Sequence, residues 1–302
     1  MSFTTDVLEE LLILPTGKPC CRKALLCGLF YRGTRLEGTT VRVTFRSERV
    51  AALAADLLKR QFSTDSDTEV TARAGQKLYT LTARSKAVAT FLDALDGPSE
   101  ELFFQLVGFR CAECAHFFLR GVFMACASIT DPHKGYHGEF SVPTQIRAER
   151  LRVFLTDLVA KPIRAVRSHG IGLIYKSNGN LADLLYFLGA SDASFQIANI
   201  CIERDIRNQE NRATNCVTRN ISRAVDASRR QVAAIEFLRC AYKFDGLPEE
   251  LRYTAQLRCD NVSASLSELA RLHEPPISKS GLNRRLTCIV EAAKDAGYAE
   301  EA

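Results

Sequence analysis

The sequence lacks the long apolar segments of a membrane protein. None of its apolar runs approaches the roughly 20 residues that a helix needs to cross a bilayer. It also lacks the pattern of a secretory signal, because the first segment, MSFTTDVLEELLILP, puts acidic residues before a short apolar run and has no basic start or small-residue cleavage site. We interpret this segment as an amphipathic helix and expect a cytoplasmic protein without a membrane partner.

The motifs of several enzyme classes are missing as well. The sequence has no G-x-x-x-x-G-K-[ST] loop and no G-x-G-x-x-G loop to cradle phosphates, and no residue arrangement typical of a covalent nucleophile. The five histidines form no spaced set of metal ligands, and we interpret His133 and His137 as surface residues. The sequence therefore offers no basis for an enzyme, and we expect no cofactor.

The composition that remains is ordinary for a globular protein. The 302 residues leave room for two domains with separate cores, and 46% apolar with 25% charged residues is a normal balance. The 11 cysteines, an odd number scattered from Cys20 to Cys288, suit a reducing compartment in which thiols pack as small apolar groups. We therefore expect no disulfides.

An internal repeat occupies the first 200 residues. The segments CCRKALLCGLFYRGT and CAHFFLRGVFMACAS each have a cysteine seven residues before a glycine and an aromatic residue two positions after it. Three further pairs follow in the same order with a similar offset: VRVTF and YHGEF, KLYT and LIYK, and TFLDALDG and YFLGA. Four matches in one order predict a duplicated unit, with halves at about 18–98 and 110–200.

Each half predicts the order helix, strands, helix, strands, helix. Alternating apolar and polar residues at 41–46, for example, indicate a strand with one buried face. The first helices contain small residues four positions apart, Ala24 and Gly28 in one and Gly121 and Ala125 in the other. Small residues at this spacing let two helix backbones approach closely, so we expect these helices to pack together along a pseudo-twofold axis.

This domain resembles the LAGLIDADG homing-endonuclease fold, a saddle of two αββαββα halves, through LCGLFYRG and LRGVFMAC as degenerate forms of its signature. In such endonucleases one acidic residue near the end of each signature helix holds the catalytic divalent ions. Those positions fall on Gly33 and Cys126, and the nearest acids, Glu37 and Asp131, lie beyond the helix ends. We therefore expect a catalytically inactive domain with no metal at these positions.

The strand face of the saddle is a candidate DNA contact through Arg42, Thr44 and Arg46. The matching strand of the second half carries His137 and Glu139 instead, so a solvated face is the favoured interpretation. A scaffold or docking role fits this domain better, with another regulatory protein as the candidate partner.

Four cysteines leave an alternative open. Cys111 and Cys114 form a C-x-x-C pair, and with Cys20 and Cys21 they can supply four thiolates to zinc if the two central helices begin side by side. No regular second C-x-x-C pair exists, and cysteines are common throughout the chain. The sequence therefore favours packing thiols over a metal site.

A basic segment follows the repeat. Residues 201–217 are rich in Arg and Asn and predict an inter-domain linker. Six arginines against Glu210 and Asp226 give the stretch from Arg207 to Arg230 a local charge of +4, within a chain whose net charge is only +5.

From Ile221 a helix is predicted. Its apolar or small stripe is Ala224, Val225, Ser228, Val232 and Ile235, and its outer face carries Arg219, Arg223, Arg229 and Arg230. A solvated face is the alternative to phosphate contact, which the arginine density favours.

Residues 218–302 predict a helical domain that ends in a helix-turn-helix at about 264–292. One helix starts near Pro248, and two more are separated by Pro275 and Pro276. The expected buried sides are Leu266, Leu269 and Leu272 in the first helix of the motif and Leu282, Leu286 and Ile289 in the second.

The last helix carries the candidate DNA-binding residues. Ser278 is placed as its N-cap, with Ile277 and Leu282 as a hydrophobic staple. A helix-turn-helix reads base edges with the N-terminal part of its second helix, so Arg284 is suited to guanine and Asn283 to adenine. Lys279 and Ser280 lie on the same outward face, and Arg285, nearer the core edge, is a candidate phosphate contact. No acidic residue interrupts 277–290.

In the order of these parts the chain resembles the WhiA family of Gram-positive bacterial regulators over nearly its whole length, above all in SKSGLNRRL and in the Arg- and Asn-rich run. That run is carried by Arg207, Asn208, Asn211, Arg212, Asn215 and Cys216. The resemblance implies a nucleoid-associated transcription factor of sporulation or cell division, in which the endonuclease-like domain is inactive and the helix-turn-helix recognises promoters in double-stranded DNA. The N-terminal half departs most from the family, in its cysteines and in FYRGTRLEG. Two alternatives remain, a protein-interaction scaffold in division or chromosome organisation with non-specific DNA binding, and a degenerate nuclease.

Overall fold

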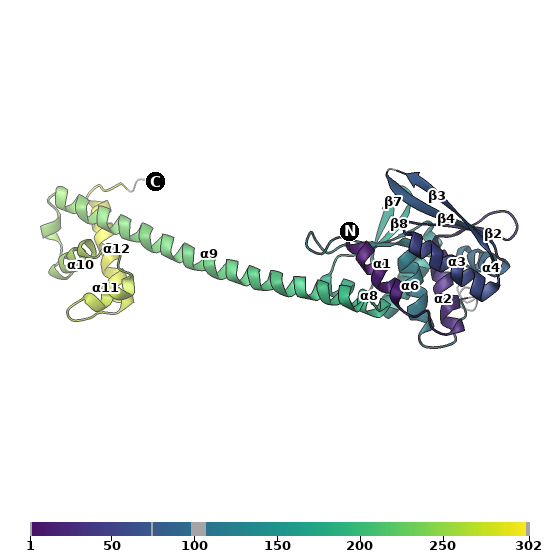
Figure 1. The fold of residues 1–302 in the computed structure, drawn as a ribbon. Coiled ribbons are helices and arrows are strands. Elements are labelled where there is room, and N and C mark those ends of the chain that lie inside the picture. Colours follow the sequence, from purple (N-terminus) through teal and green to yellow (C-terminus); the bar gives the residue numbers. More distant parts are fainter. Residues whose placement is uncertain (1, 74, 98–106, 300–302) are drawn as a thin grey trace. The chain divides into compact units, whose positions relative to one another are not determined.

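The computed structural model describes residues 2–73, 75–97 and 107–299, and the chain divides into two compact units between Arg204 and Asp205 (Figure 1). Strands occur in the first unit, and the described part of the second is helical. Mixed α and β structure followed by a helical region confirms the predicted fold class.

The N-terminal unit begins with the amphipathic helix α1 (Phe3–Ile13) and then repeats one plan twice. The first half consists of α2 (Pro19–Leu29), η1 (Phe30–Arg32), β1 (Thr34–Arg35), β2 (Thr40–Phe45), α3 (Glu48–Phe62), β3 (Ser66–Arg73), β4 (Gln76–Arg84) and α4 (Lys86–Asp96). The second half consists of α6 (Cys114–Cys126), β5 (Ala127–Ile129), β6 (Gly138–Val142), α7 (Gln145–Leu158), β7 (Ile163–Arg167), β8 (Gly170–Tyr175) and α8 (Asn178–Leu188).

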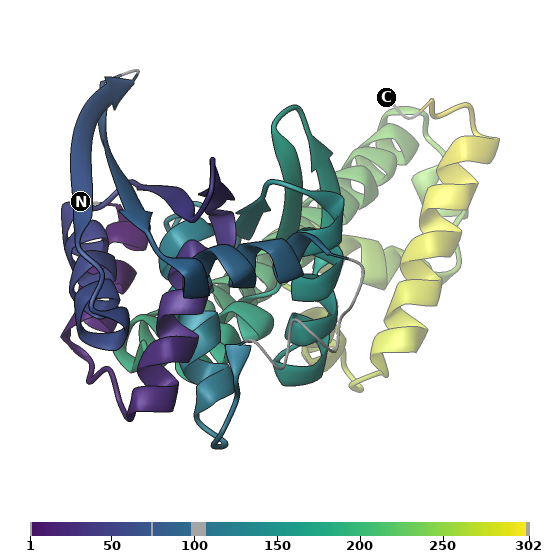
Figure 2. The ribbon, with the colours of Figure 1, turned by 90° about the vertical axis from the view of Figure 1, so that its right-hand side faces the viewer.

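The two antiparallel sheets have the same topology, which confirms the duplication. Their strand orders are β1-β2-β4-β3 and β5-β6-β8-β7. Val43 opposes Leu81 in the first sheet and Phe140 opposes Leu173 in the second, and all four side chains are buried in one core that both halves share. Figure 2 shows the strands along one side of this unit and most of its helices along the other.

The central helices α2 and α6 cross at their glycines. A Cβ atom added to Gly28 would lie 2.1 Å from the carbonyl oxygen of Phe118, and one added to Gly121 would lie 2.2 Å from that of Leu25. Ala24 of α2 is buried as well. The predicted contact between the two helices is therefore confirmed, and it depends on the absence of side chains at the crossing.

Two buried arginines of α7 form a second contact between the halves that the sequence did not indicate. Arg147 makes an ion pair with Asp96 at 2.6 Å and donates hydrogen bonds of 2.8 Å to the carbonyl groups of Tyr31 and Gly33. Arg150 donates to carbonyl groups at the end of α4, those of Ala94, Leu95 and Gly97. Carbonyl groups at a helix C-terminus have no partner within the helix, so α7 satisfies those of α4.

Helix α9 (Ser191–Cys240) runs through the boundary between the units. The whole of 201–217, predicted as a linker, is thus helical. Ser228 and Ile235 pack toward the core of the second unit as expected. The prediction was wrong for Ala224 and Val225, which are exposed. Among the described residues, no helix combines the length and apolar character that a membrane crossing requires.

The second unit continues with η2 (Phe244–Gly246), α10 (Glu249–Asp260), α11 (Leu266–Leu272) and α12 (Lys279–Asp295). Arg258 is 2% exposed and donates to the carbonyl group of Ala264 at 2.9 Å, while Ser228 donates to that of Val262 at 2.6 Å. Both hydrogen bonds hold the turn between α10 and α11 in place. They therefore fix the point at which the predicted helix-turn-helix begins.

Candidate nucleic-acid interface

The predicted helix-turn-helix is formed by α11 and α12. Ser265 caps α11 in a capping box, since its side chain accepts from the backbone N–H of Glu268 and the Glu268 carboxylate accepts from the backbone N–H of Ser265. The backbone N–H of Ile277 donates to the carbonyl group of Ala270 at 3.1 Å, which closes the turn between the helices. The start of α12 is thereby held against α11.

Apolar residues on the inner sides of both helices join one core. Leu269 and Ala270 of α11 pack with Leu282, Leu286 and Ile289 of α12. The prediction was wrong for Leu272, which is 49% exposed at the end of α11. With its inner side packed, α12 presents the opposite side of its first two turns to solvent.

The outward side of α12 carries four of the candidate DNA-binding residues. Lys279, Ser280, Asn283 and Arg284 are all exposed. A shallow pocket between the two helices is lined by Leu266 of α11 and by three of these residues, Lys279, Ser280 and Asn283. Long and polar side chains are thus grouped on one accessible face where a base edge or a phosphate can be reached.

Arg285 lies apart from this group. Its guanidinium makes an ion pair of 2.6 Å with the carboxylate of Glu250 in α10 and is only about one-quarter exposed. Arg285 therefore links α12 to α10, and this ion pair competes with the predicted phosphate contact.

Ser278 caps α12 as predicted, because its hydroxyl accepts from the backbone N–H of Gly281 at 3.0 Å. We expect Ser278→Ala to destabilise the first turn of α12 by about 1 kcal/mol, since the helix loses an N-cap acceptor. Amide hydrogen exchange at Gly281 should accelerate about fivefold. Ser278→Asp keeps an acceptor and should preserve the protection. Thr287→Ala, in the third turn, should leave the exchange unchanged, and an equal acceleration there would contradict a local capping effect.

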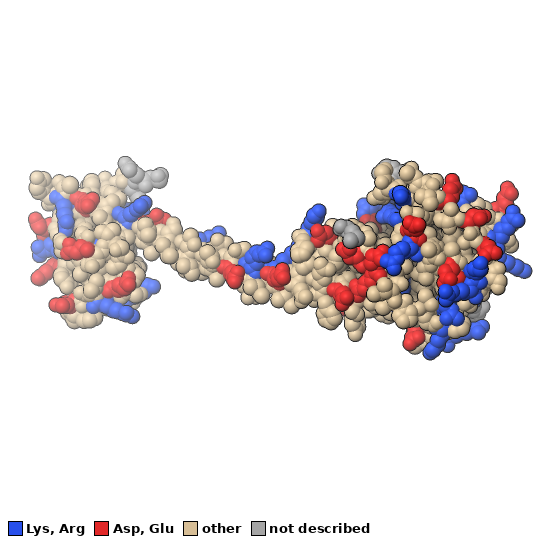
Figure 3. Space-filling view, viewed as in Figure 1, with Lys and Arg blue, Asp and Glu red and all other residues tan. Residues whose placement is uncertain are grey.

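The four candidate arginines of α9 all have exposed side chains: Arg219, Arg223, Arg229 and Arg230. One acidic residue, Asp226, lies among them in the sequence and accepts a hydrogen bond from Ser222. On the face of the helical unit that Figure 3 shows, basic and acidic side chains alternate. This face of the helical unit therefore does not present a surface of one sign.

At the ends of the central helices, the positions that hold catalytic acids in homing endonucleases carry no carboxylate. Gly33 follows η1 and Cys126 is the last residue of α6, with its thiol donating to the carbonyl group of Val122. A pocket of about 700 Å³ opens beside Cys126. Its Glu139 is engaged by Arg167 at 3.0 Å and by His137, and the ion pair with Arg167 lowers the pKa of Glu139. Among the described residues that line this pocket, no acidic side chain belongs to α2 or α6.

The open face of the first sheet carries mixed charge. Arg42 and Thr44 are exposed on β2 as predicted. Through the register of β4, Asp67 and Glu69 of β3 lie on the same face. An anionic backbone would therefore meet both signs of charge there.

Metal-ligating side chains gather instead at the opposite ends of the central helices. Within the described part of the chain, one group of three or more candidate ligands is found, Cys20, Cys21, Cys111 and Cys114. Hydrogen bonds from Cys114 and Cys21 lower the pKa of Cys111 to about 7, whereas burial raises that of Cys21 to about 12. The four cysteines are the residues for which the sequence left a zinc site open.

Comparison with known proteins gives matches to both units. Models of the "WhiA C-terminal HTH domain" and the "WhiA LAGLIDADG-like domain" match residues 211–293 and 115–207. A probable cell division protein WhiA from Alkaliphilus metalliredigens is 30% identical over 95% of each chain. One from Caldicellulosiruptor saccharolyticus is 31% identical over 98% of this chain and 95% of the relative. The crystal structure of full-length WhiA from Thermotoga maritima shares the fold, with a TM-score of 0.62 and 23% identity over 99% of this chain and 100% of that one.

Proposed function

The chain belongs to the WhiA family, and from this membership we propose that it is a sequence-specific transcriptional regulator of cell division or sporulation that binds promoter DNA in the nucleoid. The observation that carries the proposal is the outward side of α12, where Lys279, Ser280, Asn283 and Arg284 are exposed on the two turns that a helix-turn-helix places in the major groove. The absence of acidic residues from 277 to 290 keeps this face attractive to DNA.

In this proposal, two groups of residues have different roles in DNA binding. Arg284 and Asn283 read base edges, because guanidinium and carboxamide groups match guanine and adenine in the major groove. Arg219, Arg223 and Arg229 contact phosphates, which adds affinity that depends on salt and carries no sequence choice. Lys279 and the N-terminal amides of α12 hold the helix against the DNA backbone.

The endonuclease-like domain catalyses no reaction in this proposal. Two-metal cleavage needs carboxylate oxygens close to both ions, and Gly33 and Cys126 supply none. The mixed charge around Arg42, Asp67 and Glu69 favours a surface that docks another regulatory protein over one that holds DNA.

Binding of the full chain to DNA over a salt series tests the proposal. Genomic fragments enriched by the protein should bind at least about 1,000-fold more tightly than random DNA of equal length, and both affinities should fall steeply with salt. Equal affinity for enriched and random DNA would favour the scaffold with non-specific binding, and a flat salt dependence would contradict phosphate contact. Magnesium-dependent nicking by the purified chain would contradict the inactive domain.

A further inference from the structure

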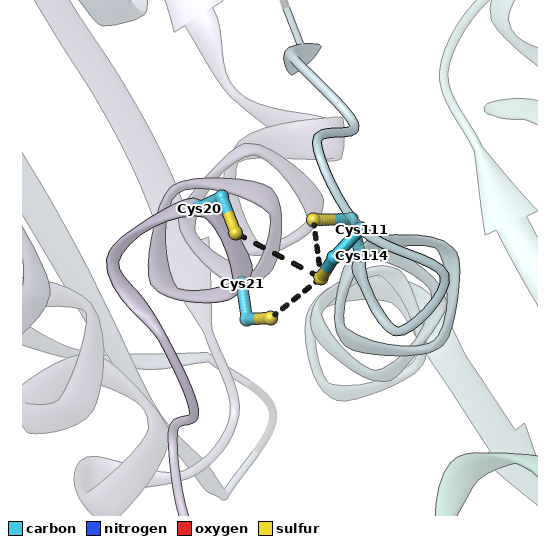
Figure 4. A group of neighbouring side chains, drawn as sticks. All are labelled: Cys20, Cys21, Cys111 and Cys114. Carbon is cyan, nitrogen blue, oxygen red and sulfur yellow. Dashed lines mark hydrogen bonds between the residues drawn. The ribbon is translucent and has the colours of Figure 1, made fainter.

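Four cysteine side chains converge where the two central helices begin. Cys20 and Cys21 lie in the first turn of α2, Cys114 is the first residue of α6, and Cys111 precedes it by three residues. Their sulfur atoms all lie within 4.8 Å of one another, and Figure 4 shows the four side chains pointing toward a common centre. Each half of the duplicated unit therefore contributes two thiols to one group.

Three of the distances between the sulfur atoms are close to those around a single zinc ion. The Sγ atom of Cys111 lies 3.8 Å from that of Cys20 and 3.5 Å from those of Cys21 and Cys114. Zinc bonded to four sulfur atoms at about 2.3 Å in a tetrahedron separates them by about 3.8 Å. A disulfide needs about 2.05 Å between its sulfur atoms, and these thiols are all free.

Positive charge lies near the four sulfur atoms. The N-terminal ends of α2 and α6 meet here, and the partial positive charge of each helix end stabilises negative charge on nearby sulfur. Lys18 and Arg22 flank the first pair in the sequence, and Arg110 precedes the second. Cys21 and Cys114 are buried and Cys20 and Cys111 are half-buried, so that an ion among them would be largely screened from water.

We propose that Cys20, Cys21, Cys111 and Cys114 bind one Zn²⁺ ion as a closed tetrathiolate site. Four protein ligands fill the tetrahedron and leave no open position for water, so the ion stabilises the fold and performs no reaction. It fastens the N-terminal ends of α2 and α6, while the contact of Gly28 with Gly121 fixes their crossing. The site does not depend on DNA binding by α12.

Metal analysis of the full chain, purified under reducing conditions without chelator, tests the site directly. We expect one zinc per chain in the unaltered protein and in the control Cys216→Ser, which replaces an exposed cysteine of α9. The double variant Cys111→Ser, Cys114→Ser should contain none. Absence of zinc from the unaltered protein after supplementation, or its retention in the double variant, would overturn the proposal, as would iron in its place.

Cobalt substitution keeps the test decisive if the double variant does not fold. Unaltered protein stripped of metal and loaded with Co²⁺ should show the sulfur-to-cobalt charge-transfer and d–d absorption of a tetrahedral tetrathiolate. One equivalent of added Zn²⁺ should then remove this spectrum. An octahedral cobalt spectrum, or no binding by the reduced protein, would contradict the site.

Removal of zinc from the unaltered protein should also loosen the two helix ends specifically. We expect amide exchange in the first turns of α2 and α6 to accelerate roughly tenfold or more, because folding and ligation are coupled in structural zinc sites. Exchange in α12, in the other unit, should stay the same. Equal exchange at α2 and α6 with and without metal would contradict a structural role for the ion.

Discussion

Gly28→Ala is expected to destabilise the N-terminal unit by about 3 kcal/mol or more. The added methyl group would lie 2.1 Å from the carbonyl oxygen of Phe118 and 2.8 Å from the backbone nitrogen of Val122. Both atoms belong to the backbone of α6 and cannot rotate away, so the two helices must move apart. Their separation would loosen the core that both halves share. Alanine gains only about 1 kcal/mol in helix propensity over glycine, which does not offset this cost.

The measurement is thermal unfolding of the full chain, followed by a signal from the N-terminal unit. For a unit of about 200 residues, a loss of this size lowers the midpoint by about 6–12 °C. Gly179→Ala in α8 is the matched control, because its added methyl group would contact only the Ser177 hydroxyl at 3.7 Å. The control should leave the midpoint unchanged or slightly raised. A normal midpoint for Gly28→Ala would show that the helices do not cross at this glycine in solution.

The counterpart Gly121→Ala should cost about as much, and the two effects should not add. Once α2 and α6 have moved apart to admit one methyl group, the second enters a space that is already open. We expect the double variant to lose less stability than the sum of the single losses, by an interaction energy within the range of about 0.5–3 kcal/mol. Full additivity would indicate two separate defects instead of one shared interface.

The duplicated architecture could be predicted from the sequence because it depends on patterns within short segments, and these patterns occur in both halves. Alternation along 41–46 fixes which face of β2 is buried, and small residues four positions apart mark the helix crossing. The N-cap of α12 was likewise predictable from Ser278 with its neighbours, since capping depends on residues within one turn.

The predictions failed or fell short where a partner lies far away in the sequence. Arginines in a helix such as α7 are typical of a solvated face, yet Arg147 binds the carbonyl group of Tyr31 in the other half. Arg150 binds carbonyl groups at the end of α4. Arg285 meets Glu250, which lies 35 positions earlier. Cys20 and Cys21 lie about 90 positions before Cys111 and Cys114 in the sequence. Only the packing of α2 on α6 brings the four sulfur atoms within 4.8 Å of one another.

Two outcomes in the helical part of the chain have local causes. The Arg- and Asn-rich segment 201–217, predicted as a linker from its few large apolar residues, is helical because arginine is a good helix former and an exposed helix needs no apolar face. Leu266, Leu269 and Leu272 recur every third residue, a period that drifts around a helix of 3.6 residues per turn. Leu272 therefore turns to solvent, and Ala270 packs inward.

Arg284→Ala is expected to weaken binding to the enriched DNA site by about 5- to 150-fold, equivalent to about 1–3 kcal/mol. The reason is the loss of two parallel hydrogen bonds from the guanidinium to one guanine, which random DNA does not offer in register. Affinity for random DNA should fall much less, so the ratio of the two affinities should shrink. Full-chain binding to both DNAs, measured by filter retention at one fixed salt concentration, gives this ratio directly.

Three further variants separate base reading from charge. Lys243→Ala removes one exposed positive charge from the same unit, outside α12, and should change both affinities little. Arg219→Ala should weaken binding to both DNAs alike. It should also reduce the slope of log affinity against log salt concentration by about one. Arg284→Lys keeps the charge but cannot form the bidentate pair, so it should retain binding to random DNA and lose preference for the enriched site. Two outcomes would contradict base reading by Arg284: an equal loss of binding to both DNAs in Arg284→Ala, or full preference for the enriched site in Arg284→Lys. Arg284 would then be a phosphate contact, and base reading would be reassigned to Asn283 and its neighbours.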